Sequence, residues 1–225
     1  MKRVVTAIFV FLISVNLSYA PMFDYYDFSD YSEIPVAGIS KKENIGVLGK
    51  LRLYKLRSGR DRIYFSDNIV ISKDAKNSII FAIRTAEEFL GEPESSYFVQ
   101  FDLPADKVSG KSSSSAVFLL TVAVNMHKNI RQDILVSGDI DTNYELSSGG
   151  HILIKILAAK NKGINTVIFP DQERKILEKH IVRKDPEKNY FVTKEVDFSE
   201  YVKNNIGSKV IIRKDIREIL EIMIK

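Results

Sequence analysis

Apolar and polar positions follow two different periods along the chain, and these periods predict strands and helices in mixed order. The expected strands are 47–56, 62–65, 97–103, 134–136, 166–169 and 210–212. The expected helices are one with its apolar positions between 79 and 90, followed by 113–126, 152–162 and 216–224. Ser72 or Asp74 can cap the first helix, and Gly91 can end it. Residues 58–61 read Ser-Gly-Arg-Asp, so the first two strands are expected to form a hairpin. The pattern predicts an α/β (α+β) domain of small mixed sheets packed with helices.

The first 20 residues have a different pattern. Lys2 and Arg3 precede the apolar run 4–15, and the small residues of Ser18-Tyr19-Ala20 follow it. This is the layout of a secretory signal peptide, while Pro21 disfavours cleavage and leaves an N-terminal membrane anchor open. We therefore expect residues 1–20 to be a signal or an anchor that contacts the membrane through 4–20. The rest of the chain is expected to be secreted or membrane-anchored and extracytoplasmic.

Two further segments lack a clear period. Residues 21–35 interleave aromatic and acidic side chains, so we expect an acidic and aromatic tether over 21–43. The alternative is that this segment docks into a groove of its own domain. The domain itself is expected over 44–225, with a charged insertion at about 172–208 that contains Pro186.

Composition narrows the possible functions. A hydrophobic content of 45% with 28% charged residues is typical of a globular protein. Without cysteine there is no disulfide, thiol nucleophile or thiolate metal ligand. The net charge of +4 falls to +2 without Lys2 and Arg3, which is too little to indicate nucleic acid. His127, His151 and His180 show no metal-ligand spacing, so we expect neither a metal nor another cofactor.

Candidate chemistry lies in two apolar stretches. Ser112 begins a run of four serines that opens one of them, and Lys155 is the lone charged residue in residues 152–159. A lysine acts as a base only when neutral, and apolar surroundings favour the neutral amine. The ordinary alternatives are a serine that caps a helix and a lysine whose ammonium reaches solvent.

The order of several short motifs distinguishes between these alternatives. They are Gly110-Lys111-Ser112-Ser113-Ser114, Asp133, Ser137-Gly138-Asp139, Gly150, Lys155-Ile156-Leu157-Ala158-Ala159 and Gly163-Ile164-Asn165-Thr166-Val167-Ile168-Phe169-Pro170. Together they resemble the proteolytic domain of the Lon proteases, most closely its archaeal branch, over residues 44–171 and 209–224. With Lys155 on the family's catalytic lysine, Ser112 falls on its nucleophile 43 positions earlier without a gap.

The resemblance implies roles for the matched residues. Ser112 would be the nucleophile and Lys155 the base, with Ser137 orienting the amine where the family has threonine. Asp139 would support the architecture of the site. Gly110 and Ser113 would shape the nucleophile turn, whose backbone N–H groups are candidate oxyanion donors.

The resemblance also implies a mode of action. The 225 residues contain no AAA+ module, so we expect an ATP-independent Ser–Lys endopeptidase. Its substrates would be unfolded or flexible extracytoplasmic polypeptides. Because the family assembles into rings, the resemblance implies a homo-oligomeric ring with 171–208 at the interface or entrance.

Other interpretations remain. Lys111 stands where the family has Asp or Pro, and His151 stands where it has glycine. Residues 105–112 fit a relaxed phosphate-binding loop in which Lys111 would grip phosphate and Ser112 would hold Mg²⁺. A non-catalytic binding or assembly protein of the same fold is the third possibility.

Overall fold

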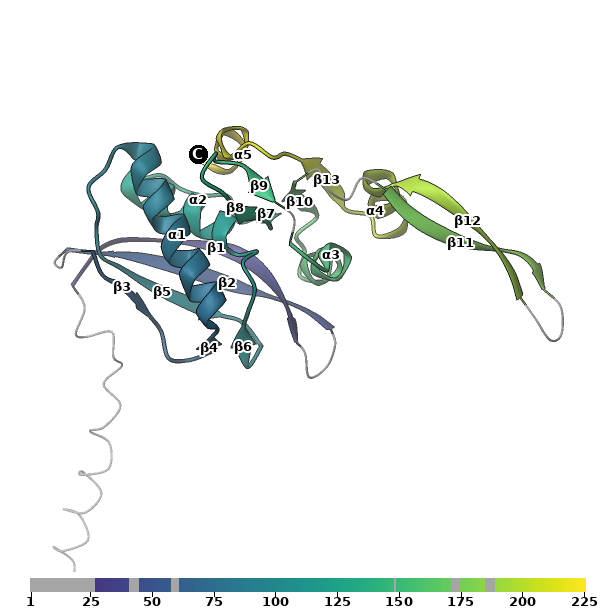
Figure 1. The fold of residues 1–225 in the computed structure, drawn as a ribbon, viewed down its shortest axis with the longest axis horizontal. Coiled ribbons are helices and arrows are strands. Elements are labelled where there is room, and N and C mark those ends of the chain that lie inside the picture. The colour runs from purple at the N-terminus through teal and green to yellow at the C-terminus, as the bar shows by residue number, and fades with distance from the viewer. Residues whose placement is uncertain (1–26, 41–44, 58–60, 148, 171–174, 185–188) are drawn as a thin grey trace, which may run out of the picture.

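A computed structural model describes residues 27–40, 45–57, 61–147, 149–170, 175–184 and 189–225. Strands and helices are mixed along the chain, as the sequence pattern predicted (Figure 1). The helices are α1 (Lys73–Leu90), α2 (Ser114–Asn125), α3 (Ile152–Asn161), α4 (Phe198–Asn205) and α5 (Ile216–Met223). The strands are β1 (Phe28–Ser40), β2 (Ile45–Leu56), β3 (Ile63–Phe65), β4 (Val70–Ile71), β5 (Tyr97–Asp102), β6 (Lys107–Val108), β7 (Ile134–Val136), β8 (Asp139–Ile140), β9 (Leu146–Ser147), β10 (Thr166–Phe169), β11 (Lys175–Lys184), β12 (Asn189–Asp197) and β13 (Lys209–Ile212).

The largest sheet has four strands in the order β1-β2-β5-β3. β2 pairs antiparallel with both β1 and β5, and β3 pairs parallel with β5. The expected hairpin between the first two predicted strands is therefore wrong, because β5 lies between β2 and β3. Tyr97, Phe98 and Val99 of β5 are all buried, which suits an interior strand covered on both faces.

The expected tether is wrong over Phe28–Ser40, which form β1. β1 pairs with β2 from Phe28↔Leu56 to Ser40↔Ile45, and Ile34 and Val36 lie in the core. The domain thus includes residues well before position 44. Tyr31 and Glu33 of β1 occupy the opposite face, where Glu33 pairs with Arg52 and Tyr31 stacks on Tyr54, so apolar periodicity alone did not reveal the strand. Residues 1–26, with the expected signal or anchor, lie outside the described residues.

The main core lies between this sheet and two helices. α1 begins and ends as predicted: the Ser72 hydroxyl accepts a hydrogen bond from the Ala75 N–H, and Gly91 adopts the left-handed conformation at φ 68°. α1 packs on α2, whose residues from Ser114 to Val124 are buried (Figure 1). The expected buried helix is therefore confirmed, and its N-terminus is held deep in the molecule.

A second core surrounds the parallel sheet β13-β10-β7. α3 packs there through Ile156 and Ala159, and α4 packs through Phe198 and Val202. α3 also lies against β2, because a Cβ on Gly46 would stand only 2.4 Å from the carbonyl oxygen of Ile154. Glycine at this position allows the close approach of the helix that carries Lys155 to the four-stranded sheet.

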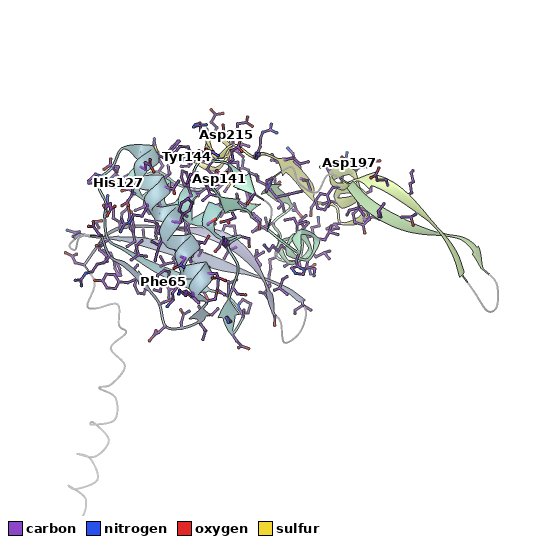
Figure 2. All side chains as sticks on the ribbon, viewed as in Figure 1. Phe65, His127, Asp141, Tyr144, Asp197 and Asp215 are labelled. Carbon is purple, nitrogen blue, oxygen red and sulfur yellow. The ribbon has the colours of Figure 1, made fainter. Side chains whose placement is uncertain are left out.

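The expected insertion contains ordered elements. β11 and β12 form an antiparallel hairpin that projects away from the rest of the fold, with α4 at its base (Figure 1). Asp197, labelled at that junction in Figure 2, caps α4 by accepting a hydrogen bond from the Glu200 N–H at 3.0 Å. In the described part of the chain, no helix combines the length and the apolar character needed to cross a membrane.

Candidate active site

Ser112 lies in a tight turn between β6 and α2. Gly110 precedes it at φ 85°, a conformation that glycine adopts without strain. The turn is tied to the β7–β8 connection by two backbone hydrogen bonds. The Gly138 N–H donates to the Ser112 carbonyl at 3.2 Å, and the Ser115 N–H donates to the Gly138 carbonyl at 3.3 Å. The turn and this connection are therefore held as one unit.

Lys155 reaches that unit from α3. Its side chain is buried, and its Nζ donates hydrogen bonds to Ser112 Oγ at 2.8 Å and to Ser137 Oγ at 3.1 Å. Among the described residues no carboxylate forms an ion pair with it. Burial without a counter-charge lowers the pKa of Lys155 to about 8. The structure therefore brings together Ser112, Lys155 and Ser137, which the motif spacing predicted to share a site.

Asp139 faces the buried side of the turn. Its Oδ1 accepts hydrogen bonds from Ser114 Oγ at 2.7 Å and from Ser78 Oγ at 3.2 Å. Ser114 Oγ also accepts the Ile140 N–H at 2.9 Å, so one hydroxyl joins the start of α2 to β8. Asp139 thus lies where a supporting residue was expected.

Ser114 is a supporting residue that sequence reasoning missed. Ser113 was predicted as supporting, and it occupies the N-cap position of α2, yet its side chain makes no capping hydrogen bond. The next hydroxyl, Ser114, makes the contacts to Asp139 and Ile140. Four serines in a row give no local signal that separates these roles, because only the fold decides which hydroxyl faces inward.

Gly149 is a second residue that the sequence did not single out. A Cβ at this position would stand 2.5 Å from Ser112 Cβ and 3.4 Å from Lys155 Nζ. Its backbone therefore lies directly against the Ser112–Lys155 pair, where no larger residue fits. His151, two residues later, is the N-cap of α3 and has a φ of 63°. Its carbonyl accepts a hydrogen bond from the Lys155 N–H at 3.2 Å.

The Ser112–Lys155 pair opens into a cleft of about 760 Å³. One side is formed by the end of β1, and another by the connection from β5 through β6 to the Ser112 turn. The lining residues with a direct bearing on chemistry are Ser112, Ser113, Lys155, Lys107, Lys111 and His151.

The phosphate-loop interpretation does not match this geometry. Lys107–Val108 form β6 within the motif and pair with Val70–Ile71 of β4, so the loop is interrupted where a phosphate cradle needs a continuous turn. Ser112 Oγ is instead engaged by Lys155. Within the described ranges, no group of three or more His, Cys, Asp or Glu side chains is arranged to hold a metal ion.

Comparison with known proteins agrees with the motif order. Residues 68–207 match the family model of the Lon protease (S16) C-terminal proteolytic domain. The chain is 32% identical over 104 residues to a Lon protease of Geobacter metallireducens, which covers 44% of this chain and 12% of that protein. It is 30% identical over 74 residues to the archaeal Lon protease of Methanocaldococcus jannaschii, which covers 33% of this chain and 11% of that protein.

A Lon protease of Fervidobacterium nodosum is 31% identical over 110 residues, 46% of this chain and 14% of that protein. The chain thus matches 11–14% of the length of these three relatives. The family model spans more than half of the chain, includes Ser112, Ser137 and Lys155, and agrees with the mixed α/β fold. The chain therefore belongs to the Lon protease (S16) C-terminal proteolytic domain family, a family of serine peptidases.

Proposed function

We propose that this protein is an endopeptidase that hydrolyses peptide bonds with Ser112 as nucleophile and Lys155 as general base. The observation that carries the proposal is the 2.8 Å hydrogen bond between Ser112 Oγ and the buried Lys155 Nζ. A serine hydroxyl is a weak nucleophile until a neighbouring base accepts its proton. A lysine whose pKa is lowered to about 8 by burial is neutral in roughly a tenth of the molecules at pH 7, far more than for an ordinary lysine.

The reaction then proceeds in two halves. The neutral Lys155 amine accepts the Ser112 hydroxyl proton while Oγ attacks the carbonyl carbon of the substrate. When the tetrahedral intermediate collapses, the Lys155 ammonium gives that proton to the departing amine and an acyl-serine ester remains. Lys155 next accepts a proton from water, which attacks the ester, and finally returns the proton to Ser112 Oγ as the new carboxyl group leaves.

Two features support stabilisation and alignment along this path. The Ser137 hydroxyl lies 3.1 Å from Lys155 Nζ and holds the amine toward Ser112. The backbone N–H groups of Ser112 and Ser113 have no hydrogen-bond acceptor among the described residues, and they stand at the start of α2. Free N–H groups beside the nucleophile are suited to receive the oxyanion of the tetrahedral intermediate.

We further propose that cleavage needs no nucleotide and acts on unfolded or flexible polypeptides. The nucleophile, the base and the open cleft all belong to this domain, so hydrolysis itself requires no other module. A cleft that accepts an extended chain cannot use a peptide bond held inside a folded core. The N-terminal residues 1–20 support an extracytoplasmic location, which would make loose exported proteins the natural substrates.

Assembly into a homo-oligomeric ring is a separate proposal. The projecting β11–β12 hairpin offers a surface for contacts between copies at the interface or entrance of such a ring. Light scattering on the purified protein tests it. A multiple of the monomer mass is expected, and a monomer at every concentration would rule the ring out.

The decisive experiment for the activity uses the purified chain with casein as an unfolded substrate and without nucleotide. Ser112→Ala and Lys155→Met are expected to lower the cleavage rate by at least about a thousand-fold. Lys162→Met, at the exposed end of α3, is the matched control and is expected to cleave normally. Equal cleavage by all four proteins would contradict the proposal, and cleavage by none would favour the non-catalytic binding protein.

A further inference from the structure

From the charges that line the cleft, we infer that this site prefers substrates with an acidic residue beside the scissile bond. The inference rests on the proposed function and adds the class of substrate to it. It is carried by two lysines, Lys107 and Lys111, that line the same cleft as Ser112. Neither residue has a part in the proton transfers of the proposed mechanism.

Both lysines belong to one wall of the cleft. Lys107 lies in β6, and Lys111 immediately precedes Ser112, so both residues border the approach to the nucleophile. Both side chains are exposed. Two lysines on one wall of a concave site give that wall a positive potential.

The acidic residues of the cleft do not balance this charge. Among the described residues that line the cleft, Asp139 is the one acid against Lys107 and Lys111, and its Oδ1 accepts hydrogen bonds from Ser78 and Ser114 on the buried side of the Ser112 turn. Among the described residues, no carboxylate forms an ion pair with Lys107 or Lys111. Asp106 is next to Lys107 in sequence but does not line the cleft. The two ammonium groups are therefore available to a substrate.

The side of the cleft formed by β1 is apolar. Val36, Ala37 and Ile39 at the end of β1 contribute no charge, and Leu103 in the connection after β5 adds a further apolar surface. A bound peptide therefore meets cations on the Ser112 side and hydrocarbon on the β1 side. Side chains of an extended peptide alternate between two directions, so an acidic residue with an apolar neighbour matches both surfaces at once.

The size of the effect follows from the exposure of the lysines. Single exposed ion pairs change an equilibrium by only a few-fold, because water screens them. With two lysines on one wall, we expect kcat/KM to be about five-fold higher for a peptide with an acidic residue than for one with a neutral residue. We expect a similar decrease in kcat/KM from the neutral to the basic residue. The preference is expected to weaken from about 0.05 M to about 0.5 M salt, since the screening length shortens over that range.

The test uses three quenched fluorescent peptides that share one sequence. Mass spectrometry of the casein products first locates a bond that the protein cleaves. The three peptides contain this bond and carry Glu, Gln or Lys at the positions on either side of it. kcat/KM is measured for each peptide with the full chain. Binding of the same peptides to Ser112→Ala is measured by fluorescence anisotropy, so charge preference is also read where no cleavage occurs.

Charge reversal provides the matched variants. The double variant Lys107→Glu with Lys111→Glu is expected to reverse the order, so that the Lys peptide binds and is cleaved best. Lys128→Glu with Lys162→Glu changes the net charge equally at exposed positions outside the cleft, and it is expected to keep the original order. The pair of variants separates a local effect of the cleft from the charge of the whole molecule.

The outcomes separate the two proposals. Glu peptides that bind Ser112→Ala most tightly and are cleaved fastest by the wild type, with both orders reversed in the cleft variant, support the preference. Cleavage of all three peptides at equal rates with equal binding overturns the preference and leaves the peptidase intact. A preference that persists in the cleft variant or vanishes in the outside control also overturns it, because its source would then lie elsewhere.

Discussion

At the scale of single residues, the protonation state of Lys155 governs the proposed chemistry. Burial lowers its pKa to about 8, and only the neutral amine can accept the Ser112 proton. We predict that log kcat/KM rises with a slope near one below about pH 8 and levels off above it. A pH–rate profile with an uncharged peptide measures this, and a flat profile between about pH 6 and about pH 9 would contradict it.

The same shift has a consequence for stability. The unfolded chain binds a proton at Lys155 up to the ordinary lysine pKa of 10.5, whereas the folded chain loses it at a pKa of about 8. The unfolded state therefore holds more protons between these values, and this residue makes the free energy of unfolding increase with pH across that window, by roughly 3 kcal/mol in total. Below about pH 8 the buried ammonium carries the full penalty.

Lys155→Met tests that consequence. The variant is predicted to be inactive yet more stable than the wild type near pH 7, because a similarly long apolar side chain replaces a buried ammonium. Urea unfolding at about pH 7 and about pH 10 should show that the difference in the free energy of unfolding between variant and wild type becomes smaller as pH rises. Lys162→Met replaces an exposed lysine and should have the same free energy of unfolding as the wild type at both pH values. A variant less stable than the wild type at the lower pH would mean that the hydrogen bonds of Lys155 outweigh its desolvation.

At the scale of elements, the start of α2 and the β7–β8 connection act as one support. Ser114 Oγ joins them by donating to Asp139 and accepting from the Ile140 N–H. Ser114→Ala leaves the buried Ile140 N–H without this acceptor and leaves Asp139 Oδ1 with Ser78 Oγ alone, so we predict a loss of about 1–3 kcal/mol in the free energy of unfolding and a lower kcat. Denaturant titration and kinetics measure these effects. Ser113→Ala is the control, with little loss of stability because that side chain makes no capping bond.

The segment before α3 gives a second prediction at this scale. Gly149→Ala places a Cβ where 2.5 Å separates it from Ser112 Cβ, so the loop or the nucleophile turn must move. We predict at least about a ten-fold fall in kcat, because small displacements of reacting groups are costly. Gly150→Ala has open space around its new Cβ and should retain activity. Equal kinetics for the two variants would show that the loop yields without disturbing Ser112.

At the scale of the whole molecule, β1 completes both the core and the cleft. Ile34 is fully buried in the main core, while Val36 to Ile39 line the cleft. Ile34→Ala is predicted to lower the free energy of unfolding by about 2–5 kcal/mol, as for other buried aliphatic truncations. Tyr31→Ala on the same strand, 59% exposed, should cost less than about 1.5 kcal/mol. Thermal or urea unfolding compares them, and a negligible loss for Ile34→Ala would contradict the place of β1 in the core.

Much of this architecture was predictable because it depends on near neighbours in the chain. The helical period, Ser72 and Gly91 predicted α1 with both ends, since a cap contacts groups only a few residues away. The unbroken apolar run predicted a buried α2. The spacing between Ser112 and Lys155 anticipated that the two would meet, but through likeness to a family and not through local physics.

The sequence by itself determined α1, α2, α3 and α5, the six strands β2, β3, β5, β7, β10 and β13, the family resemblance and the identity of the candidate pair, because these follow from local periodicity and ordered motifs. Only the tertiary structure decided that β5 lies between β2 and β3 and that β1 joins the sheet, because strand partners come from distant segments. It also decided that Ser114 faces Asp139 and that Gly149 lies against Ser112. Burial of Lys155 without a counter-charge, the cause of its lowered pKa, likewise arises from packing between elements far apart in the chain.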